Sequence, residues 1–112
     1  MSGTSDIIGS GKRNTQLIVE RLKQLGENGR AAQLCASLNF DGFNDWFLPS
    51  KDELDLMYKN LKKAGKGNLG DKYYWSSSEG YRDNAWYQNF NDGSQYGDNK
   101  TTTYSIRAVR AF

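Results

Sequence analysis

Few residues in this chain have the types and spacing that enzymatic chemistry needs. Its 112 residues include no histidine, the commonest general base and metal ligand, and a single cysteine, Cys35, so no intrachain disulfide can form. Cys35 lies on a helical apolar stripe without a neighbouring base, which favours a small buried hydrophobe over a reactive thiol. Asp41 and Asp45 lack the regular acidic spacing of a calcium loop, and loop Asp side chains usually bond their own backbone. The sequence therefore predicts no enzyme, no metal site and no cofactor.

Residues 85–105 have the side chains of noncovalent recognition instead. The stretch AWYQNFNDGSQYGDNKTTTYS combines Tyr, Asn, Asp, Ser, Thr and Gly with Trp86 and Phe90 at strand spacing. Tyr offers a large amphipathic contact at low entropic cost, and Ser, Gly and Asn adapt their hydrogen bonds, as in antibody paratopes. Turns and strand surfaces favour the same residue types, so composition alone supports a recognition surface and an ordinary surface about equally.

Strand alternation assigns faces to this stretch. Asp92-Gly93 is a favoured two-residue hairpin turn, which predicts that Asn89 faces Tyr96 on the next strand. The predicted inward residues are Trp86, Gln88 and Phe90, and the outward residues are Tyr87, Asn89, Asn91, Ser94, Tyr96 and Asp98, continued by residues 101–104.

Two helices are expected to come first in the chain. The first is predicted to be capped by Asn14 or Thr15 and ended by Gly26, and the second is predicted over about residues 30–38. Their apolar stripes are Leu17, Ile18, Leu22 and Leu25 in the first helix and Ala31, Leu34, Cys35 and Leu38 in the second.

A structured loop and a third helix follow. The loop over residues 39–49 is expected to be pinned by Trp46 and Phe47. In the next motif, PSKDEL, Ser50 and Glu53 form a capping box. The helix that it starts is predicted to end near residue 65, with an apolar stripe of Leu54, Met57, Tyr58 and Leu61.

After residue 72 the pattern changes from helical to alternating. YYWSSSE (73–79) and NAWYQNF (84–90) predict two strands, and YSIRAVRAF (104–112) predicts a C-terminal strand. IIGSGKR (7–13) fits either a brief edge strand or an extended arm. Helices followed by strands predict the α+β class.

Length and charge limit the remaining possibilities. The chain fits one domain over residues 1–112, with residues 1–6 expected to be disordered. A formal net charge of +2 lacks the basic excess of a nucleic-acid binder, so no nucleic-acid partner is expected. No stretch is apolar enough for a signal peptide or a membrane span, so no membrane insertion is expected. The cluster at the end of the third helix is interpreted as a solvated helix end in preference to an anion site; it consists of Lys59, Lys62, Lys63 and Lys66.

Four ordered motifs carry a family resemblance. DGFNDWFLPSKDELDLMYKNL, YYWSSSE, AWYQNFNDGSQY and IRAVRAF together closely resemble the C-terminal domain family of collagen-like bacterial adhesins, in the C-type-lectin-fold superfamily. The resemblance runs from about residue 8 to residue 112. It implies a C-type-lectin-like fold with two main helices and a short helix packed on a small twisted antiparallel sheet, and with long irregular loops. Within that family, the chain looks still more like the variable proteins of diversity-generating retroelements.

In such retroelements, reverse transcription mutates adenines of a template repeat before the repeat is copied into the gene. The templates are rich in AAY asparagine codons, interrupted by fixed framework residues. The framework here is taken as Ala85, Trp86, Gln88, Phe90, Gly93, Gln95 and Lys100. Every other residue from 80 to 105 is Gly, Tyr, Arg, Asp, Asn, Ser or Thr, all of which AAY codons reach by adenine changes alone. This agreement corroborates the resemblance.

The resemblance implies a binding module with a variable ligand-binding region over residues 80–105. Its implied ligand is a protein or a cell-surface molecule, with a glycan as a further option, and display on a virion or cell surface as a homo-oligomer or within a larger assembly is expected. The implied ligand-binding residues are Tyr81, Arg82, Asp83, Asn84, Tyr87, Asn89, Asn91, Asp92, Ser94, Tyr96, Asp98, Asn99, Thr101, Thr102, Thr103 and Tyr104. The implied scaffold residues are Trp46, Trp75, Trp86 and Phe90. The alternative is a fixed adhesin-type domain that binds sulfated polysaccharide or glycan through Lys59, Lys62, Lys63, Lys66 and Arg82.

The chain departs from its relatives in three respects. Family members commonly carry a β segment upstream of the part that matches IIGSGKRNT. Either the sheet is reduced, or Ile7 and Ile8 add a strand beside SIRAVRAF, or a partner chain covers the edge. The Glu-Pro-Asn type loop of calcium-dependent sugar-binding lectins is absent. Formylglycine-generating enzymes share the superfold, but Cys35 alone cannot supply their cysteine pair or copper thiolates.

Overall fold

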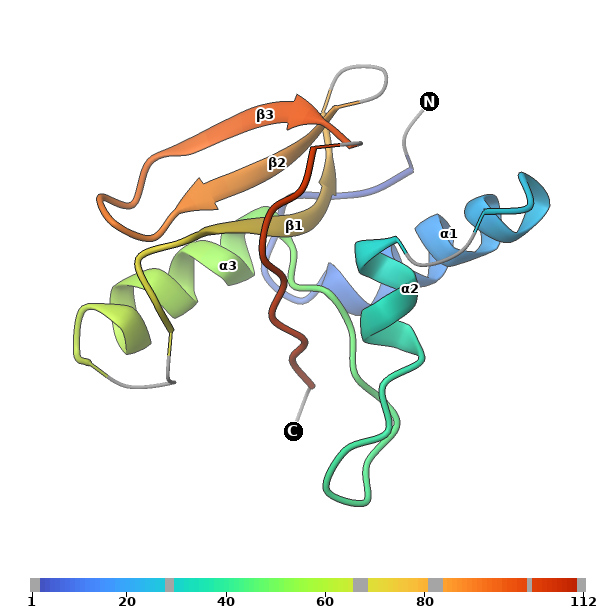
Figure 1. Cartoon of the computed structure of the whole chain (residues 1–112), viewed down its shortest axis with the longest axis horizontal. Helices are drawn as coiled ribbons and strands as arrows, with labels where there is room; N and C mark the ends of the chain where they lie inside the picture. The colour runs from blue at the N-terminus through green and yellow to red at the C-terminus, as the bar shows by residue number, and fades with distance from the viewer. Residues whose placement is uncertain (1–2, 28–29, 66–68, 81–83, 101, 111–112) are drawn as a thin grey trace.

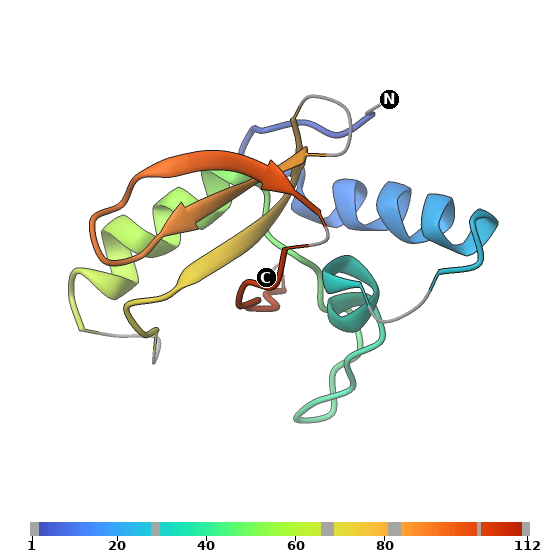
Figure 2. The same ribbon diagram turned by 45° about the horizontal axis from the view of Figure 1, so that its top comes forward.

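The computed structural model describes residues 3–27, 30–65, 69–80, 84–100 and 102–110. These residues form three α-helices, a short π-helical extension and a three-stranded antiparallel sheet, which confirms the α+β class (Figure 1). The elements are α1 (Gly11–Gln24), α2 (Ala31–Ala36), α3 (Lys51–Met57) with its extension η1 (Tyr58–Lys62), β1 (Tyr73–Glu79), β2 (Asn84–Asn89) and β3 (Gln95–Asn99). The strand order is β1-β2-β3, and α1 and α2 lie beside the sheet (Figures 1 and 2).

Helix α1 begins earlier than predicted. Ser10 is its N-cap residue, and the two predicted caps, Asn14 and Thr15, are buried inside the helix. The Asn14 carboxamide accepts from the Ser5 backbone N–H at 2.9 Å and donates to the Ser5 carbonyl at 2.6 Å. The Thr15 hydroxyl accepts from the Leu48 N–H at 3.0 Å. Both side chains therefore bond to distant segments of the chain, a use that helix-capping patterns do not reveal.

The predicted apolar stripes of the first two helices are buried only in part. A small core forms from Ala32, Cys35 and Leu48. Leu25 of the α1 stripe is nevertheless 64% exposed and Leu34 of α2 is 51% exposed. The reason is the placement of the two helices: because they lie beside the sheet, neither presents its whole stripe to it (Figure 2). The predicted end of the first helix at Gly26 is confirmed, since this residue adopts a φ of 74° directly after the helix.

Cys35 is a buried hydrophobe, as predicted, with 1% of its surface exposed. Burial disfavours the thiolate and raises the pKa of the Cys35 thiol to about 12. We expect the folded protein to resist alkylation by iodoacetamide near neutral pH, because only an opened state exposes a reactive thiol. Timed labelling followed by mass spectrometry, with and without urea, measures this. Labelling of the folded protein as fast as that of the unfolded chain would contradict this packing.

Residues 7–13 form neither the expected edge strand nor the expected extended arm: residues 7–9 lie in a turn and residues 11–13 begin α1. The segment that bonds to β1 and α3, which we call the N-terminal arm, is residues 4–9. The Ser78 hydroxyl donates to the Ser5 carbonyl at 2.8 Å, and the Glu79 N–H donates to the Thr4 hydroxyl at 2.9 Å. A third bond runs from the Asp52 N–H to the carbonyl of residue 6 at 2.9 Å. The expectation of disorder over residues 1–6 is therefore wrong for residues 4–6, and residues 1 and 2 lie outside the described part. Ile7 and Ile8 lie in a turn, exposed by 63% and 60%.

Helix α3 begins at the predicted capping box. The Ser50 N–H donates to Glu53 Oε1 at 2.7 Å, and the Glu53 N–H donates to Ser50 Oγ at 3.3 Å. The same two side chains also bind the arm, since Glu53 Oε2 accepts from the Gly9 N–H at 2.8 Å and Ser50 Oγ donates to the Ile7 carbonyl at 2.9 Å. One local motif therefore both starts the helix and fixes the N-terminal arm.

Consecutive buried serines of β1 provide a matched test of these bonds. Ser78 Oγ donates to the Ser5 carbonyl and accepts from the Lys51 N–H, both at 2.8 Å. Ser77 Oγ is buried without a hydrogen-bond partner in the described part of the chain. We expect Ser78→Ala to lower the free energy of unfolding by about 1–3 kcal/mol, because it leaves a buried N–H unpaired. Ser77→Ala should leave it unchanged or raise it slightly. Urea titration of both variants compares them, and equal losses would contradict the assignment.

The predicted C-terminal strand over residues 104–112 is wrong. This segment forms only two isolated bridges in its described part, Tyr74 with Ser105 in parallel and Phe47 with Val109 in antiparallel orientation. The edge of β1 has no further room for it, because the Ser77 N–H already donates to the Pro49 carbonyl at 2.7 Å. The chain therefore leaves β1 after Ser105 and continues towards the loop that precedes α3 (Figure 1).

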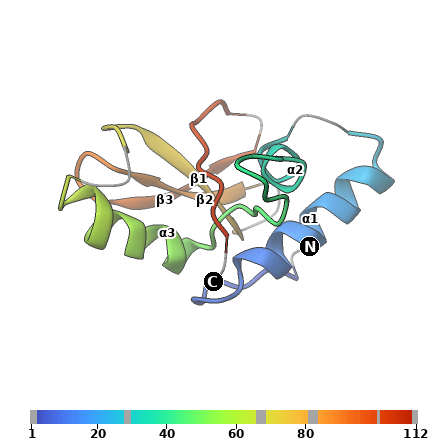
Figure 3. The ribbon, with the colours of Figure 1, turned by 90° about the horizontal axis from the view of Figure 1, so that it is seen from below.

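A second core joins α3 to the sheet. Its buried residues are Leu54, Tyr74 and Phe90, with Met57, Tyr58 and Leu69 packed against them. Figure 3 shows α3 running along one face of the sheet. The opposite face of the sheet carries the strand side chains that alternate with these core residues along each strand. In the described part of the chain, no helix has the length and apolar content that a membrane crossing requires.

Candidate functional site

The hairpin between β2 and β3 decides which side chains lie next to one another. Tyr87 pairs with Tyr96, whereas the turn pattern predicted Asn89 at that position. The connection is longer than the predicted two residues: the Asn89 N–H donates to the Ser94 carbonyl at 2.8 Å, so residues 90–93 form the loop. Because the register differs by two residues, which is the side-chain period of a strand, the predicted faces are unchanged.

The inward face is fixed to α3 by side-chain amides. Gln88 is fully buried, and its Nε2 donates to Asp55 Oδ1 at 2.9 Å. Gln95 Nε2 donates to the Lys51 carbonyl at 3.0 Å. Trp86 is half-buried, with the Lys51 ammonium 3.9 Å from its ring centroid. These contacts leave the outward side chains of the same strands on the face away from α3.

A cluster of aromatic rings covers this outward face. We define the tyrosine cluster as Tyr73, Tyr87, Tyr96 and Tyr104, with Trp75 beneath them. The ring of Tyr87 is central: its centroid lies 4.5 Å from that of Tyr104, 5.5 Å from that of Tyr73 and 6.0 Å from that of Tyr96. Tyr73 and Tyr96 are 44% and 55% exposed, while Trp75 is buried. The result is a continuous aromatic surface with a rigid floor.

Tyr104 connects the three strands. Its ring lies 4.9 Å from that of Trp75 in β1 and packs on Tyr87 in β2. Its hydroxyl donates to Asp98 Oδ2 in β3 at 2.6 Å, and Asp98 Oδ1 accepts from the Asn99 N–H at 2.7 Å. The bond from Tyr104 lowers the pKa of Asp98, and the same bond raises the pKa of the Tyr104 hydroxyl. At neutral pH the pair is therefore a carboxylate and a protonated phenol.

Burial divides the stretch 84–105 into two groups. The described members of the predicted ligand-binding set are all half-buried or exposed; they are Asn84, Tyr87, Asn89, Asn91, Asp92, Ser94, Tyr96, Asp98, Asn99, Thr102, Thr103 and Tyr104. The buried residues of the same stretch are Ala85, Gln88 and Phe90, and all three belong to the proposed framework. The other framework residues are half-buried or exposed, namely Trp86, Gly93, Gln95 and Lys100. Tyr81, Arg82, Asp83 and Thr101 lie outside the described residues.

The predicted residues do not form one compact group. Tyr87, Tyr96, Asp98 and Tyr104 come together in the tyrosine cluster, whereas Asn91 and Asp92 lie at the tip of the hairpin. Tyr73 was missed, although alternation within YYW places it on the same side of β1 as Trp75. Only the pairing of β1 with β2, which sets Trp75 opposite Tyr87, puts both residues beside the predicted set.

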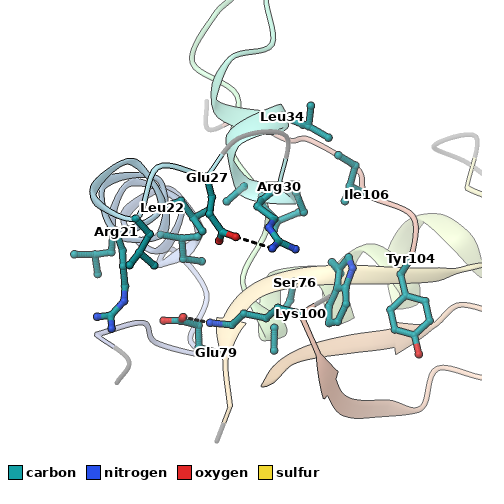
Figure 4. A pocket seen from close by; sticks show the side chains of 18 of the residues that line it. Arg21, Leu22, Glu27, Arg30, Leu34, Ser76, Glu79, Lys100, Tyr104 and Ile106 are labelled. Atoms are coloured by element: carbon teal, nitrogen blue, oxygen red, sulfur yellow. Dashed lines mark hydrogen bonds and ion pairs between the residues drawn. The ribbon is translucent and has the colours of Figure 1, made fainter. Parts of the chain in front are cut away.

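A hollow of about 800 Å³ adjoins this face between α1, α2 and the sheet. Apolar side chains, among them Leu22, Leu34 and Ile106, line much of it, and Tyr104 stands at one edge (Figure 4). Two ion pairs lie at the hollow, Glu27 with Arg30 at 2.9 Å and Glu79 with Lys100 (Figure 4). The threonines at positions 102 and 103 also line it, so the hollow is continuous with one end of the predicted site.

The lysines of the alternative polysaccharide site lie on α3 and its extension. Lys59 Nζ is 2.8 Å from Asp55 Oδ2, and Lys62 Nζ is 2.7 Å from Asp71 Oδ1. Burial raises the pKa of Asp55, but the bonds from Lys59 and Gln88 lower it more, so its pKa is below the usual value. Lys63 is exposed, and Lys66 and Arg82 lie outside the described residues. Two of the predicted anion-binding cations are therefore already paired with acids. Both belong to η1, the extension of α3, and α3 runs along the face of the sheet opposite the tyrosine cluster.

The loop before α3 projects from the molecule (Figure 1). Phe47 is buried, as predicted, but Trp46 is only half-buried and packs on Phe40 of the same loop, with ring centroids 6.3 Å apart. The Asp45 carboxylate accepts from Arg110 Nε at 2.6 Å and from Nη2 at 3.0 Å, bonds that lower the pKa of Asp45. Asp41 adopts a φ of 55° at the loop tip. Within the described ranges, no three His, Cys, Asp or Glu side chains gather as metal ligands would.

Comparison with known protein families gives a match over most of the chain. A family model described as the Lcl C-terminal domain matches residues 11–110, which include every helix and strand described above. No curated protein matches the chain.

Proposed function

The chain belongs to the Lcl C-terminal domain family, and on this premise we propose a non-enzymatic, adhesin-like binding domain of C-type-lectin-like fold. Its outward sheet face recognises a protein or a cell-surface ligand, and retroelement-driven adenine mutagenesis diversifies that face. The observation that carries the proposal is the division of burial within residues 84–105: only framework residues are fully buried, and no described residue of the variable set is.

In this arrangement the residues that stabilise the fold differ from the residues that would contact a ligand. Gln88 and Phe90 contribute to the contacts with α3, so changes there would reach the core. Tyr87, Tyr96 and Asn89 point away from it, so substitutions there leave the contacts with α3 in place; surface substitutions away from packed contacts usually change stability by less than about 0.5 kcal/mol. A gene can therefore vary the outward codons extensively while the fold persists.

Binding by this face requires no covalent bond to form. Tyr87, Tyr96 and Tyr104 supply the type of anchor that dominates protein interfaces, and the Asn, Ser and Thr side chains around them supply adaptable hydrogen bonds. A face of this kind gives modest affinity at each site, and display in several copies increases the avidity without new contacts.

The fixed polysaccharide adhesin is the less supported alternative. It depends on a set of cations, and two of them are already in ion pairs: Lys59 with Asp55, and Lys62 with Asp71. Sulfated chains would have to displace these carboxylates before they could bind. The tyrosine cluster, by contrast, needs no such rearrangement to become accessible.

Sequencing the locus tests diversification. We expect a second copy of the codons for residues 80–105 beside a reverse transcriptase gene, with mismatches confined to template adenines. Those mismatches should fall on codons such as those of Tyr87 and Tyr96 and spare those of Gln88 and Phe90. A locus without a second copy would refute diversification and leave a fixed binding domain.

Two displayed libraries test whether the face binds. One library randomises Tyr87, Asn89, Tyr96, Asp98 and Tyr104 with AAY-derived codons, and the matched control randomises the framework residues Trp86, Gln88, Phe90 and Gln95. We expect folded display and binders to a panel of purified proteins from the first library only. Binders in equal number from the framework library, or none from the first, would contradict the proposed face.

A further inference from the structure

We propose that the tyrosine cluster takes a cationic group, the guanidinium or ammonium of an Arg or Lys side chain on a protein partner, over the Tyr87 ring and beside the Asp98 carboxylate. This inference rests on the proposed function and names the chemistry of the ligand.

The charge of Asp98 is the first reason. Within the described residues its partners are the Tyr104 hydroxyl, the Asn99 N–H and the Thr102 hydroxyl, all of which are neutral. The nearby acid Glu79 at the end of β1, by contrast, forms an ion pair with Lys100. These neutral donors stabilise the ionised Asp98 carboxylate, and a cation on a partner complements its negative charge.

The rings are the second reason. The face of an aromatic ring is the negative end of its quadrupole, and a cation within about 6 Å of the centroid is attracted to it. Three neighbouring centroids lie 4.5 to 6.0 Å from that of Tyr87, so one group placed there approaches several rings at once. Guanidinium fits especially well, because it is planar, weakly hydrated and able to stack on aromatic faces.

The register places charge and rings together. Tyr87 pairs with Tyr96, and Asp98 follows Tyr96 by two residues on β3, so it projects from the same face. Tyr104 joins the two features, since its ring packs on Tyr87 and its hydroxyl bonds Asp98. An anionic partner group would meet the Asp98 carboxylate at this position, so sulfated or phosphorylated ligands are disfavoured here.

Small probes test the inference on the full chain. Nα-acetyl-arginine amide and Nα-acetyl-citrulline amide have nearly the same shape, but only the first is charged. In NMR titrations we expect the arginine probe to shift the ring signals of Tyr87, Tyr96 and Tyr104 and the Asp98 amide. Its affinity should exceed that of the citrulline probe roughly five- to tenfold, the sum expected of an exposed cation–π contact and an exposed ion pair.

A pair of charge variants locates the effect. Asp98→Asn should weaken the arginine probe about three- to fivefold and leave the citrulline probe unchanged. Asp41→Asn is the matched control, because it removes the same charge from the exposed tip of the loop before α3, away from the cluster, and should change neither affinity. The arginine-to-citrulline ratio on the unmodified protein keeps the test independent of how either variant folds.

The outcomes separate this inference from the proposed function. The inference is overturned if the two probes bind equally well, or if the arginine probe shifts only NMR signals outside the tyrosine cluster. If that result accompanies binders from the outward-face library, the face is a binding surface without cation preference. If the library also yields none, both proposals fail.

Discussion

Replacing Phe90 by alanine is expected to lower the free energy of unfolding by about 3–5 kcal/mol, the range for truncation of a buried aromatic side chain. Phe90 has no exposed surface and packs with Leu54 and Tyr74 in the core beneath the sheet. Its ring centroid lies 4.7 Å from that of Tyr74 and 5.5 Å from that of Tyr58. The truncation would leave a cavity where α3, β1 and the hairpin meet. Urea titration followed by tryptophan fluorescence measures the loss.

The matched control for this variant is Phe40→Ala. Phe40 is 63% exposed and packs on Trp46 in the projecting loop. It should cost less than about 1 kcal/mol, because little apolar surface returns to water. A similar loss in both variants would place the stabilising core elsewhere than beneath the sheet.

Gly93→Ala is expected to lower the free energy of unfolding by about 2–4 kcal/mol, through a strained backbone and a steric overlap. Gly93 has a φ of 84°, and a Cβ there would lie 2.5 Å from Tyr58 Cε2 and 2.9 Å from Cζ. The Tyr58 ring cannot move away freely, because it is packed against Phe90. Thermal and urea denaturation both report the effect.

Two further glycines separate the causes. Gly42 has a φ of 79° with open space around its Cβ position, so Gly42→Ala isolates the backbone strain, about 1 kcal/mol. Gly97 lacks a positive φ, and its nearest contact would be 3.9 Å away, so Gly97→Ala should be close to neutral. The expected order of destabilisation is Gly93, Gly42, Gly97. If Gly42→Ala cost as much as Gly93→Ala, the overlap with Tyr58 would have no energetic role.

The sequence by itself determined the features that depend on neighbours in the chain. The capping box of Ser50 and Glu53 starts α3 because the cap and its partner are three residues apart. The faces of β2 were predictable for a similar reason, since side chains alternate whatever the pairing. Even the mistaken register kept Tyr87 and Tyr96 outward, because the error equalled one period of the strand.

The tertiary structure alone decided what depends on distant partners. Asn14 and Thr15 resemble caps in sequence, but the arm and the segment before α3 take up their polar atoms. The C-terminal residues alternate like a strand, yet the Pro49 carbonyl already occupies the next donor on the edge of β1. Tyr104 reaches Asp98 only because the chain leaves that edge at Ser105. Such contacts join segments far apart in the chain. Local periodicity carries no information about which distant segment will pair with a given polar group.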